Sequence, residues 1–286
     1  MQEIRDSILN KKQSKSFPNG KPYESISIAA VREIGIKAGC RGHVVEREAA
    51  LLNVAPERYA RNFRAISLAE QATLADARAV VVGLGGLGGF VSEILARLGV
   101  GHLRLIDGDR FEENNLNRQL FSHEIGMRNM KTDAVLSRIQ HINSSVSLDM
   151  HDEFLTEENA ESFFKDADVA VDCLDSIKTR LIMEKACKKM KVPMVSAAVA
   201  GWFGHVTVIY PEDPGLKSIY GDEFDEKGAE ADLGCLPFTT AAIASFECAE
   251  AVKVILKKDG VLRNKLLLMD MTESYVDVMD ISQYKK

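Results

Sequence analysis

Residues 78–119 read RAVVVGLGGLGGFVSEILARLGVGHLRLIDGDRFEENNLNRQ and decide the fold of the chain. The short apolar run at 79–82 is typical of a strand buried on both faces. A glycine turn follows at 83–88, then apolar residues at helical spacing, then a second predicted strand at 102–106. Strand, turn, helix and strand together predict one βαβ unit, which ends in Asp107, 24 residues after Gly83.

The glycine turn predicts a nucleotide site, because without a Cβ the backbone can closely approach a phosphate. The glycines concerned are Gly83, Gly85, Gly86 and Gly88. The following helix points free N–H groups and its positive dipole end toward the anion. Asp107 is placed to accept hydrogen bonds from ribose hydroxyls. By itself this fingerprint fits an NAD-dependent dehydrogenase about as well as an ATP enzyme.

Strands and helices alternate along the rest of the chain. Strands are predicted at 146–150, 168–173, 193–198 and 205–210, and helices at 67–74, 131–142, 158–164, 177–190 and 237–257. This order predicts an α/β fold with a doubly wound, mostly parallel, Rossmann-like sheet and right-handed crossovers. Runs at 266–269 and 275–279 add an antiparallel C-terminal extension, and residues 211–234 predict a long irregular loop.

Residues 1–55 predict a small N-terminal helical extension ahead of a main domain at 56–286. We expect a short helix and an extended linker within residues 1–25, then two helices at 27–38 and 43–53. A further helix is expected to start at Pro56. Two helices around a glycine turn also suggest a DNA reader. The basic surplus in this region is small and unclustered, which favours a packing role instead.

Composition narrows the classes of function. The formal charge of −6 argues against general binding to nucleic acid or anionic membranes. No apolar run approaches the ~20 residues of a membrane span, and the mixed polar start shows no secretory signal. A cytoplasmic protein is therefore expected. The five cysteines form no CxxC pair, which speaks against a disulfide framework and a structural zinc site.

The polar segment after Asp107 indicates what the nucleotide is used for. Asp107 and Asp109 emerge beside the glycine turn, and Asn115, Arg118 and Gln119 bring a cation and two amides to the same edge. Open α/β sheets bind their ligands at this carboxyl edge. The segment is too polar for a plain connection.

Two more charged residues belong to the same edge, since Lys131 opens a predicted helix there and Asp175 follows a predicted strand. A hydride-transfer enzyme has little need of two cations and a further acid around its cofactor. A triphosphate under attack needs both, because Lys and Arg neutralise charge on the phosphoryl group and a carboxylate holds Mg²⁺.

Several motifs, in order along the chain, resemble those of the MoeB/ThiF/HesA and ubiquitin-activating adenylyltransferases. The motifs are Arg58-Tyr59-x-Arg61-Asn62, Gly83-x-Gly85-Gly86-x-Gly88, Asp107-x-Asp109, Asn115-Leu116-Asn117-Arg118-Gln119 and Asp172-Cys173-x-Asp175. The resemblance covers roughly residues 57–280. Motifs in family order are far more specific than one glycine turn.

The resemblance implies a role for each matching residue. Asp107 would bind the ribose, and Asp175 would hold Mg²⁺. The phosphates would be contacted by Asn115, Arg118 and Lys131. Arg61 would act as an arginine finger on the ATP of the other subunit, which requires a homodimer.

The resemblance also implies the reaction. The C-terminal glycine carboxylate of a ubiquitin-like sulfur carrier of the MoaD or ThiS type, ending in Gly-Gly, attacks the α-phosphorus of ATP. An acyl-adenylate remains for a sulfur donor, with a sulfurtransferase or cysteine desulfurase as a further partner. Adenylylation of tRNA or a peptide, an NAD-dependent oxidoreductase and a DNA-binding regulator remain as alternatives.

Three departures from the family pattern bear on the site. Both CxxC pairs are missing, so we predict no zinc. The usual Gly-x-Pro-Lys is replaced at 126–131, which leaves Arg128 beside the favoured Lys131 as the phosphate contact. The loop at 211–234 holds no cysteine, and the nearest thiol, Cys235, stands at a helix start. There it is either a small core residue or a nucleophile with a lowered pKa.

Overall fold

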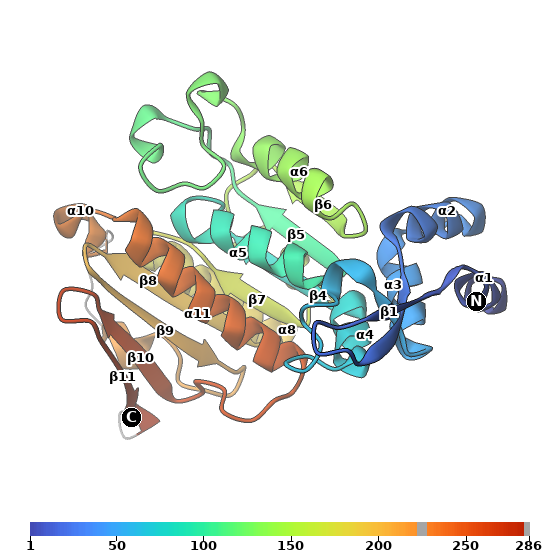
Figure 1. The fold of residues 1–286 in the computed structure, drawn as a ribbon. Helices are drawn as coiled ribbons and strands as arrows, with labels where there is room; N and C mark the ends of the chain where they lie inside the picture. Colours follow the sequence, from blue (N-terminus) through green and yellow to red (C-terminus); the bar gives the residue numbers. More distant parts are fainter. Residues whose placement is uncertain (222–227, 283–286) are drawn as a thin grey trace.

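The computed structural model describes residues 1–221 and 228–282, and within these ranges eight strands form one sheet (Figure 1). The strands are β4 (Arg78–Val82), β5 (His102–Ile106), β6 (Ser147–His151), β7 (Val169–Asp172), β8 (Met194–Ala200), β9 (Phe203–Ile209), β10 (Lys265–Asp270) and β11 (Tyr275–Asp280). Their order is β11-β10-β9-β8-β7-β4-β5-β6. Strands β8, β7, β4, β5 and β6 pair in parallel, and β9, β10 and β11 pair antiparallel. The predicted fold class is confirmed.

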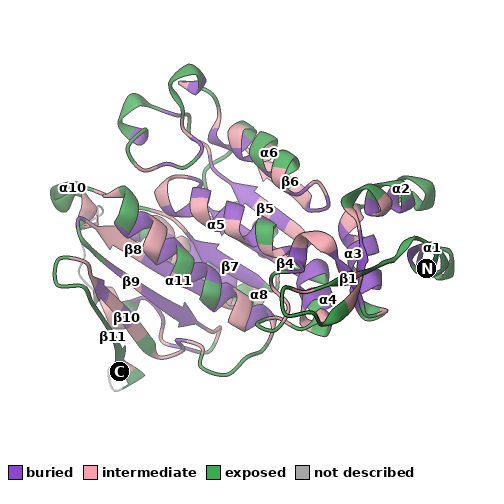
Figure 2. Cartoon of the chain, in the orientation of Figure 1, coloured by how far each residue is buried: buried purple, intermediate pink, exposed green. Residues whose placement is uncertain are grey.

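Helices cover both faces of the sheet, which is why the apolar strands are buried (Figure 2). One face packs against α5 (Gly86–Leu98), α6 (Lys131–Ile142) and α11 (Pro237–Ile255), and the other against α7 (Ala160–Phe164) and α8 (Ile177–Met190). Within β4, Val81 faces the first layer and Val80 the second. Alternate side chains of one strand therefore belong to two cores.

The segment expected as a long irregular loop at 211–234 contains two short helices, α9 (Lys217–Tyr220) and α10 (Glu230–Leu233). Its residues 222–227 lie outside the described ranges. No helix in the described part of the chain is long and apolar enough to cross a membrane.

The N-terminal region is not purely helical, and the predicted extended linker is wrong. Helices α1 (Gln2–Lys11), α2 (Ile28–Ala38) and α3 (Gly42–Leu51) surround a small sheet of β1 (Gln13–Ser16), β2 (Pro22–Ile26) and β3 (Val54–Pro56). β1 and β2 form a hairpin whose turn contains Gly20 at φ +80°, a conformation that suits glycine. An apolar cluster of its own, including Ile8, Val31 and Val45, fills this region.

The helix expected from Pro56 is a single 3₁₀ turn, Glu57–Tyr59, followed by irregular turns up to residue 66. Pro56 ends β3, which pairs with β2. Tyr59 is 1% exposed, and its ring packs on Gly99, which caps the C-terminus of α5. The chain then enters α4 (Leu68–Asp76) through a capping box at Ser67.

The N-terminal region contacts the amino ends of the central strands, the edge opposite the carboxyl ends (Figure 1). The ring centroids of His43 and His102, the first residue of β5, lie 4.3 Å apart. The backbone N–H of His43 donates to the Ser145 carbonyl at 3.1 Å. The two parts of the chain are thus joined through a ring contact and a backbone hydrogen bond.

Gly99→Ala tests the Tyr59 contact. Gly99 has φ +83°, and an added Cβ would lie 2.5 Å from the Tyr59 ring. We expect a loss of about 2–4 kcal/mol in the free energy of unfolding, from backbone strain plus overlap. Gly39→Ala, at φ +64° with no atom within 4 Å of the new Cβ, should lose only about 1 kcal/mol. Equal losses in denaturant unfolding would contradict the contact.

Helix α11 also places a carboxyl group in the core. Glu247 is fully buried, the Cys173 thiol donates to its Oε2 at 3.7 Å, and its Oε1 has no partner among the described residues. Burial raises the pKa of Glu247 well above its usual range, and nearby Asp172 raises it further. The folded state therefore favours the protonated form.

Glu247→Gln should remove a pH dependence of stability. A folded-state pKa above the unfolded value contributes stability at low pH that is lost as pH rises through the folded pKa. As the pH rises above the ordinary glutamate pKa, the free energy of unfolding of the variant should therefore increase relative to that of the unaltered protein, by about 1 kcal/mol or more near pH 8. Glu250→Gln is the control, because Glu250 accepts the Leu262 N–H and pairs with Lys253. Parallel curves of unfolding free energy against pH would refute the assignment.

Candidate nucleotide-binding site

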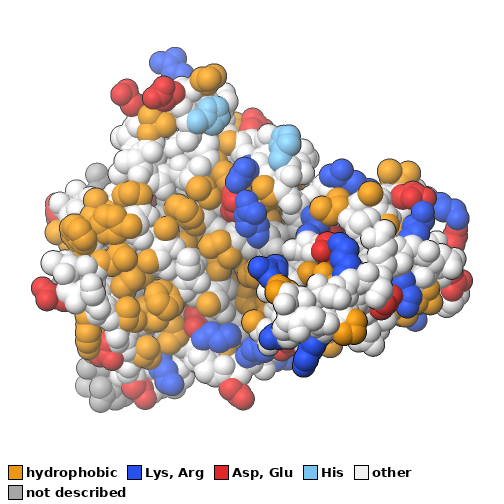
Figure 3. Space-filling view, in the orientation of Figure 1, with side chains coloured by type: hydrophobic (Ala, Val, Ile, Leu, Met, Phe, Trp, Pro, Cys, Tyr) orange, Lys and Arg blue, Asp and Glu red, His pale blue; other side chains and the backbone are white. Residues whose placement is uncertain are grey.

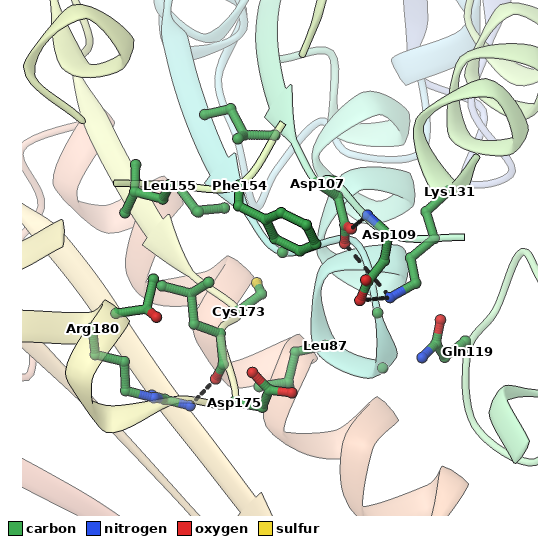
Figure 4. A pocket seen from close by; sticks show the side chains of 18 of the residues that line it. Leu87, Asp107, Asp109, Gln119, Lys131, Phe154, Leu155, Cys173, Asp175 and Arg180 are labelled. Carbon is green, nitrogen blue, oxygen red and sulfur yellow. Dashed lines mark hydrogen bonds and ion pairs between the residues drawn. The ribbon is translucent and has the colours of Figure 1, made fainter. Parts of the chain in front are cut away.

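A cleft of about 260 Å³ opens at the carboxyl ends of β4, β5 and β7 (Figure 4). Parallel α/β sheets bind ligands at this edge, since the loops that leave the strands diverge there. Most of the residues expected at the site do line the cleft. These are Gly83, Gly85, Gly86, Asp107, Asp109, Arg118, Gln119, Lys131, Asp175 and Cys235.

The glycine turn does two different things. Gly83, at φ +88°, leaves no room for a Cβ, which would lie 2.6 Å from the Cys173 carbonyl oxygen. A Cβ on Gly88 would lie 1.7 Å from the Gly83 carbonyl oxygen, so Gly88 lets α5 pack directly on the turn. Gly85 and Gly86 instead line the cleft, where the first N–H groups of α5 are open to an anion.

Asp107 is fixed by the backbone of its own turn. Its Oδ2 accepts the Leu84 N–H at 2.6 Å and its Oδ1 accepts the Asp109 N–H at 2.7 Å. Burial raises the pKa of Asp107, while Lys131 acts in the opposite direction. The carboxylate is thus held at the end of β5, where the sequence predicts the ribose.

Lys131 is the cation that lines the cleft on this side. Its Nζ lies 3.0 Å from Asp109 Oδ2 and 3.9 Å from Asp107 Oδ2, and the side chain is almost completely buried (Figure 4). Arg128, the alternative, is exposed and is not among the residues that line the cleft. Of the two, only Lys131 is in place to meet a phosphate.

Gln119 and Arg118 border the glycine turn. Gln119 is 7% exposed, its Oε1 has no partner among the described residues, and its amide faces Gly85. Arg118 donates to the Asn114 carbonyl at 2.9 Å and to Asn117 Oδ1 at 2.8 Å, which holds its guanidinium near the cleft. A cation beside free backbone N–H groups is what an anion would engage, and the unpartnered Gln119 Oε1 can accept a hydrogen bond from a ligand hydroxyl or amine.

Asn115 does not line the cleft, although the sequence groups it with the phosphate contacts. Its Oδ1 accepts the Glu112 N–H at 3.0 Å, and its Nδ2 donates to Asn114. The side chain closes the 3₁₀ turn Glu113–Asn115. In this structure it supports the segment that carries Arg118.

The third wall follows β7 and contains a buried ion pair that sequence reasoning missed. Arg180 is 3% exposed and donates to Asp172 Oδ2 at 3.1 Å, to the Ala197 carbonyl at 2.5 Å and to the Leu174 carbonyl. Burial raises the pKa of Asp172 and Arg180 opposes this. Because Leu174 precedes Asp175, the pair fixes the loop that presents the exposed Asp175 carboxylate to the cleft.

Phe154 is a second residue that the sequence analysis did not single out. It follows β6, is 62% exposed, and its ring lies over Gly108, where a Cβ would come within 2.8 Å of it. Figure 4 shows the ring in the cleft next to Asp107. The sequence signal is an aromatic residue shortly after the predicted strand at 146–150. This signal is weak, because apolar residues outside the core are common.

Cys235 lines the cleft two residues before α11. Burial raises the pKa of the thiol, and Arg118 acts in the opposite direction. A raised pKa disfavours a reactive thiolate. A covalent role for Cys235 stays a prediction.

The acids of the cleft fit a magnesium–nucleotide complex better than a metal site of the protein alone. Among residues 1–221 and 228–282, no three His, Cys, Asp or Glu side chains gather to hold a metal. Mg²⁺ characteristically takes one or two protein carboxylates and completes its shell with phosphates and water. The exposed Asp175 carboxylate, within the cleft, suits that arrangement.

Arg61 lies far from this cleft. It is exposed in the turn after Tyr59, which packs at the C-terminal end of α5. Helix α5 has 13 residues and begins at the glycine turn, so its two ends are about 20 Å apart. Arg61 therefore does not join the other expected site residues within one chain.

Solved structures share this fold. The crystal structure of E. coli MccB with ATP aligns at a TM-score of 0.66 and 23% identity, over 78% of this chain and 71% of the MccB chain. The crystal structure of selenomethionine PaaA aligns at a TM-score of 0.64 and 20% identity, over 79% of this chain and 82% of PaaA. At these identities the likeness is one of fold.

Sequence comparison goes further. Proteins named adenylyltransferase and sulfurtransferase MOCS3 from Culex quinquefasciatus and Anopheles gambiae are 34% and 33% identical to this chain over 223 residues. These matches cover 75% of this chain and 51% of each relative, so the chain spans about half the length of the curated relatives it matches. Residues 59–286 match the ThiF family along their whole length. The chain belongs to the ThiF family.

Proposed function

We propose that this protein uses ATP to adenylylate the C-terminal glycine carboxylate of a ubiquitin-like sulfur carrier of the MoaD or ThiS type. The observation that carries the proposal is the convergence of Lys131, Arg118 and Asp175 on one cleft beside a glycine turn. Two cations and a free carboxylate around a phosphate site suit displacement at phosphorus. A hydride-transfer enzyme would leave all three without a purpose.

The geometry supports one direction for the nucleotide along the strand ends. The phosphates lie at the glycine turn and the N-terminus of α5, and the ribose hydroxyls meet Asp107 at the end of β5. The next strand in the sheet is β6, and Phe154 follows it. The adenine then stacks on the exposed face of the Phe154 ring, a contact worth roughly 1–3 kcal/mol for a nucleobase on an aromatic ring.

The chemistry is a displacement at the α-phosphorus. A glycine carboxylate oxygen forms a bond to that phosphorus, the bond to the bridging oxygen of the β-phosphate breaks, and pyrophosphate leaves with the electron pair. Lys131 and Arg118 offset the negative charge that gathers on the phosphates. Asp175 would hold Mg²⁺, which would further neutralise the charge of the phosphates. The remaining contribution is alignment of carboxylate and phosphorus, which needs no covalent enzyme intermediate.

The partner is proposed from the family resemblance together with the charge of the chain. A net charge of −6 does not favour an RNA substrate. The relatives of similar sequence are named for both adenylyl transfer and sulfur transfer. A carrier ending in Gly-Gly supplies the carboxylate, and a sulfurtransferase or cysteine desulfurase would then deliver sulfur to the acyl-adenylate.

A homodimer is proposed from an apolar face and from Arg61. Figure 3 shows apolar side chains gathered over α11 and the neighbouring part of α5. Exposed or half-exposed residues of these helices and of nearby turns include Phe90, Ile94, Leu120, Trp202, Phe238 and Phe246. Apolar patches of this kind mark protein interfaces. Arg61 cannot reach the cleft of its own chain, so a second copy is the one place where it can meet ATP.

ATP–pyrophosphate exchange with purified carriers ending in Gly-Gly tests the proposed function. Exchange of label from pyrophosphate into ATP should require a carrier, and removing the terminal glycine should abolish it, because the attacking carboxylate is then displaced. No exchange with any such carrier would overturn the carrier assignment. If a peptide or a tRNA supported exchange instead, that molecule would be the substrate of the same adenylylation.

Lys131→Ala and Arg128→Ala form a matched pair of variants. Removing the buried Lys131 cation should lower the rate of exchange by about 10²-fold or more, the range seen when one group that stabilises transition-state charge is lost. Arg128→Ala removes the same charge from a neighbouring exposed position and should change the rate by less than about threefold. A larger loss from Arg128→Ala would reverse the assignment.

Mixing variant subunits tests the proposal that Arg61 acts in trans. Arg61→Ala and Asp175→Ala homodimers should each be inactive in exchange. Mixed in equal amounts, they should recover about one quarter of the activity, because half of the dimers are mixed and each holds one intact site. Failure to recover any activity, with subunit exchange verified by differently tagged chains, would refute action across the dimer.

A further inference from the structure

A buried polar cluster joins the N-terminal region to the turn ahead of Arg61. Glu46, on α3, is 2% exposed and lies within 3.1 Å of three partners. Its Oε1 pairs with Arg58 Nε at 3.1 Å and accepts the Ser145 hydroxyl at 2.9 Å. Its Oε2 accepts the Tyr59 hydroxyl at 3.1 Å. A carboxylate this deeply buried costs free energy unless each of its oxygens is satisfied, as here.

The cluster continues into the main domain through Asn143. This amide donates to the Tyr59 oxygen at 2.9 Å and to the Ala96 carbonyl of α5 at 2.7 Å, and it accepts from Arg58. Burial and the Glu46 carboxylate raise the pKa of Tyr59 well above its usual range, so its hydroxyl remains a donor. Both side chains of the Arg58-Tyr59 pair are therefore held from two directions.

The small N-terminal sheet fixes the start of the same turn. Glu57 accepts from the Tyr23 hydroxyl at 3.1 Å and from Ser25 of β2, and it pairs with Lys15 of β1 at 3.0 Å. These three partners all belong to residues 1–56. Without that region, the described contacts left to the segment 57–60 would be those to α5 and to Asn143.

Arg61 directly follows the anchored segment 57–60. Tyr59 and Ala60 are buried, the Asn62 N–H donates to the Tyr59 carbonyl at 2.8 Å, and Arg61 is exposed between them. The backbone on either side of Arg61 is thus fixed although its side chain is exposed. A long side chain on a fixed base loses less freedom when it docks, which favours its use at another subunit's site.

We infer that Glu46 is a positioning residue: through Arg58 and Tyr59, the N-terminal region sets the direction in which Arg61 meets the triphosphate of the neighbouring subunit. The inference rests on the proposed function and gives residues 1–56 a part in the reaction. It assigns them no contact with ATP. Displacement of a catalytic side chain by about 1 Å costs up to roughly 100-fold in rate, so a distant carboxylate can control the reaction.

The test uses Glu46→Gln in the full chain. It keeps the shape of the side chain but removes the charge that pairs with Arg58, and ATP–pyrophosphate exchange should fall by roughly 10- to 100-fold. Glu48→Gln is the matched control on the same helix. Glu48 is 1% exposed and pairs with Arg5 and Arg47 at 2.7 and 2.9 Å, all within the N-terminal region. Its variant should keep nearly full exchange even where its thermal stability falls.

Subunit mixing separates positioning from general damage. The Glu46→Gln chain should keep an intact cleft, so mixing it with Asp175→Ala, which keeps an intact Glu46 and Arg61, should recover about one quarter of the activity. Full exchange by Glu46→Gln alone would overturn the inference. The inference would also be overturned if the mixture of Glu46→Gln with Asp175→Ala recovered no exchange activity while the mixture of Arg61→Ala with Asp175→Ala did. Failure of that reference mixture instead overturns action in trans, and the inference with it.

A milder variant covers the case in which Glu46→Gln does not fold. Ser145→Ala removes one hydrogen bond to Glu46 and leaves the ion pair with Arg58 in place. It should lower exchange by about two- to tenfold, since one hydrogen bond to a charged group is lost, and it should recover in the same mixture. Unchanged exchange in a folded Ser145→Ala protein, with Glu46→Gln unfolded, would count against the inference.

Discussion

The site depends on one backbone contact, in which the first turn of α5 packs directly on the glycine turn that ends β4. No side chain fits at Gly88, because a Cβ there would lie 1.7 Å from the Gly83 carbonyl oxygen. This close approach brings the free N–H groups of α5 to the carboxyl edge of the sheet. Asp107, Lys131 and the loop before Asp175 are then arranged around that fixed point by the neighbouring strands.

Charge is balanced differently in the two walls of the cleft. On one wall Lys131 is paired with Asp109 and Asp107, and these carboxylates hold the cation where a phosphate can take their place. On the other wall Arg180 and Asp172 are buried together and support the backbone. Asp175 stays exposed beside them. If ATP binds as proposed, the first wall is suited to exchange the partners of Lys131, and the second is suited to remain rigid.

Much of the fold follows from local patterns, and the errors have physical causes. The ends of β5, α6 and α8 agree with the prediction, because strand and helix periodicity is strong there. The hairpin β1–β2 was missed, because its short polar strands are stabilised by tertiary pairing with β3. Asn115 sits in the predicted motif yet supports the turn, and Arg180 and Phe154 reach the cleft only through folding. Spacing in the sequence cannot say which way a side chain points, nor that Arg58 would pair with Glu46 on a separate element.

In the proposed reaction, a carboxylate oxygen attacks the α-phosphorus of ATP in this cleft. The most direct measurement labels the C-terminal carboxylate of the carrier with heavy oxygen and follows the label after the acyl-adenylate is cleaved by a thiol nucleophile. We expect heavy oxygen to appear in AMP, because the bond from that oxygen to phosphorus survives when the acyl group leaves. Release of ADP with label in inorganic phosphate, or of AMP without label, would contradict it.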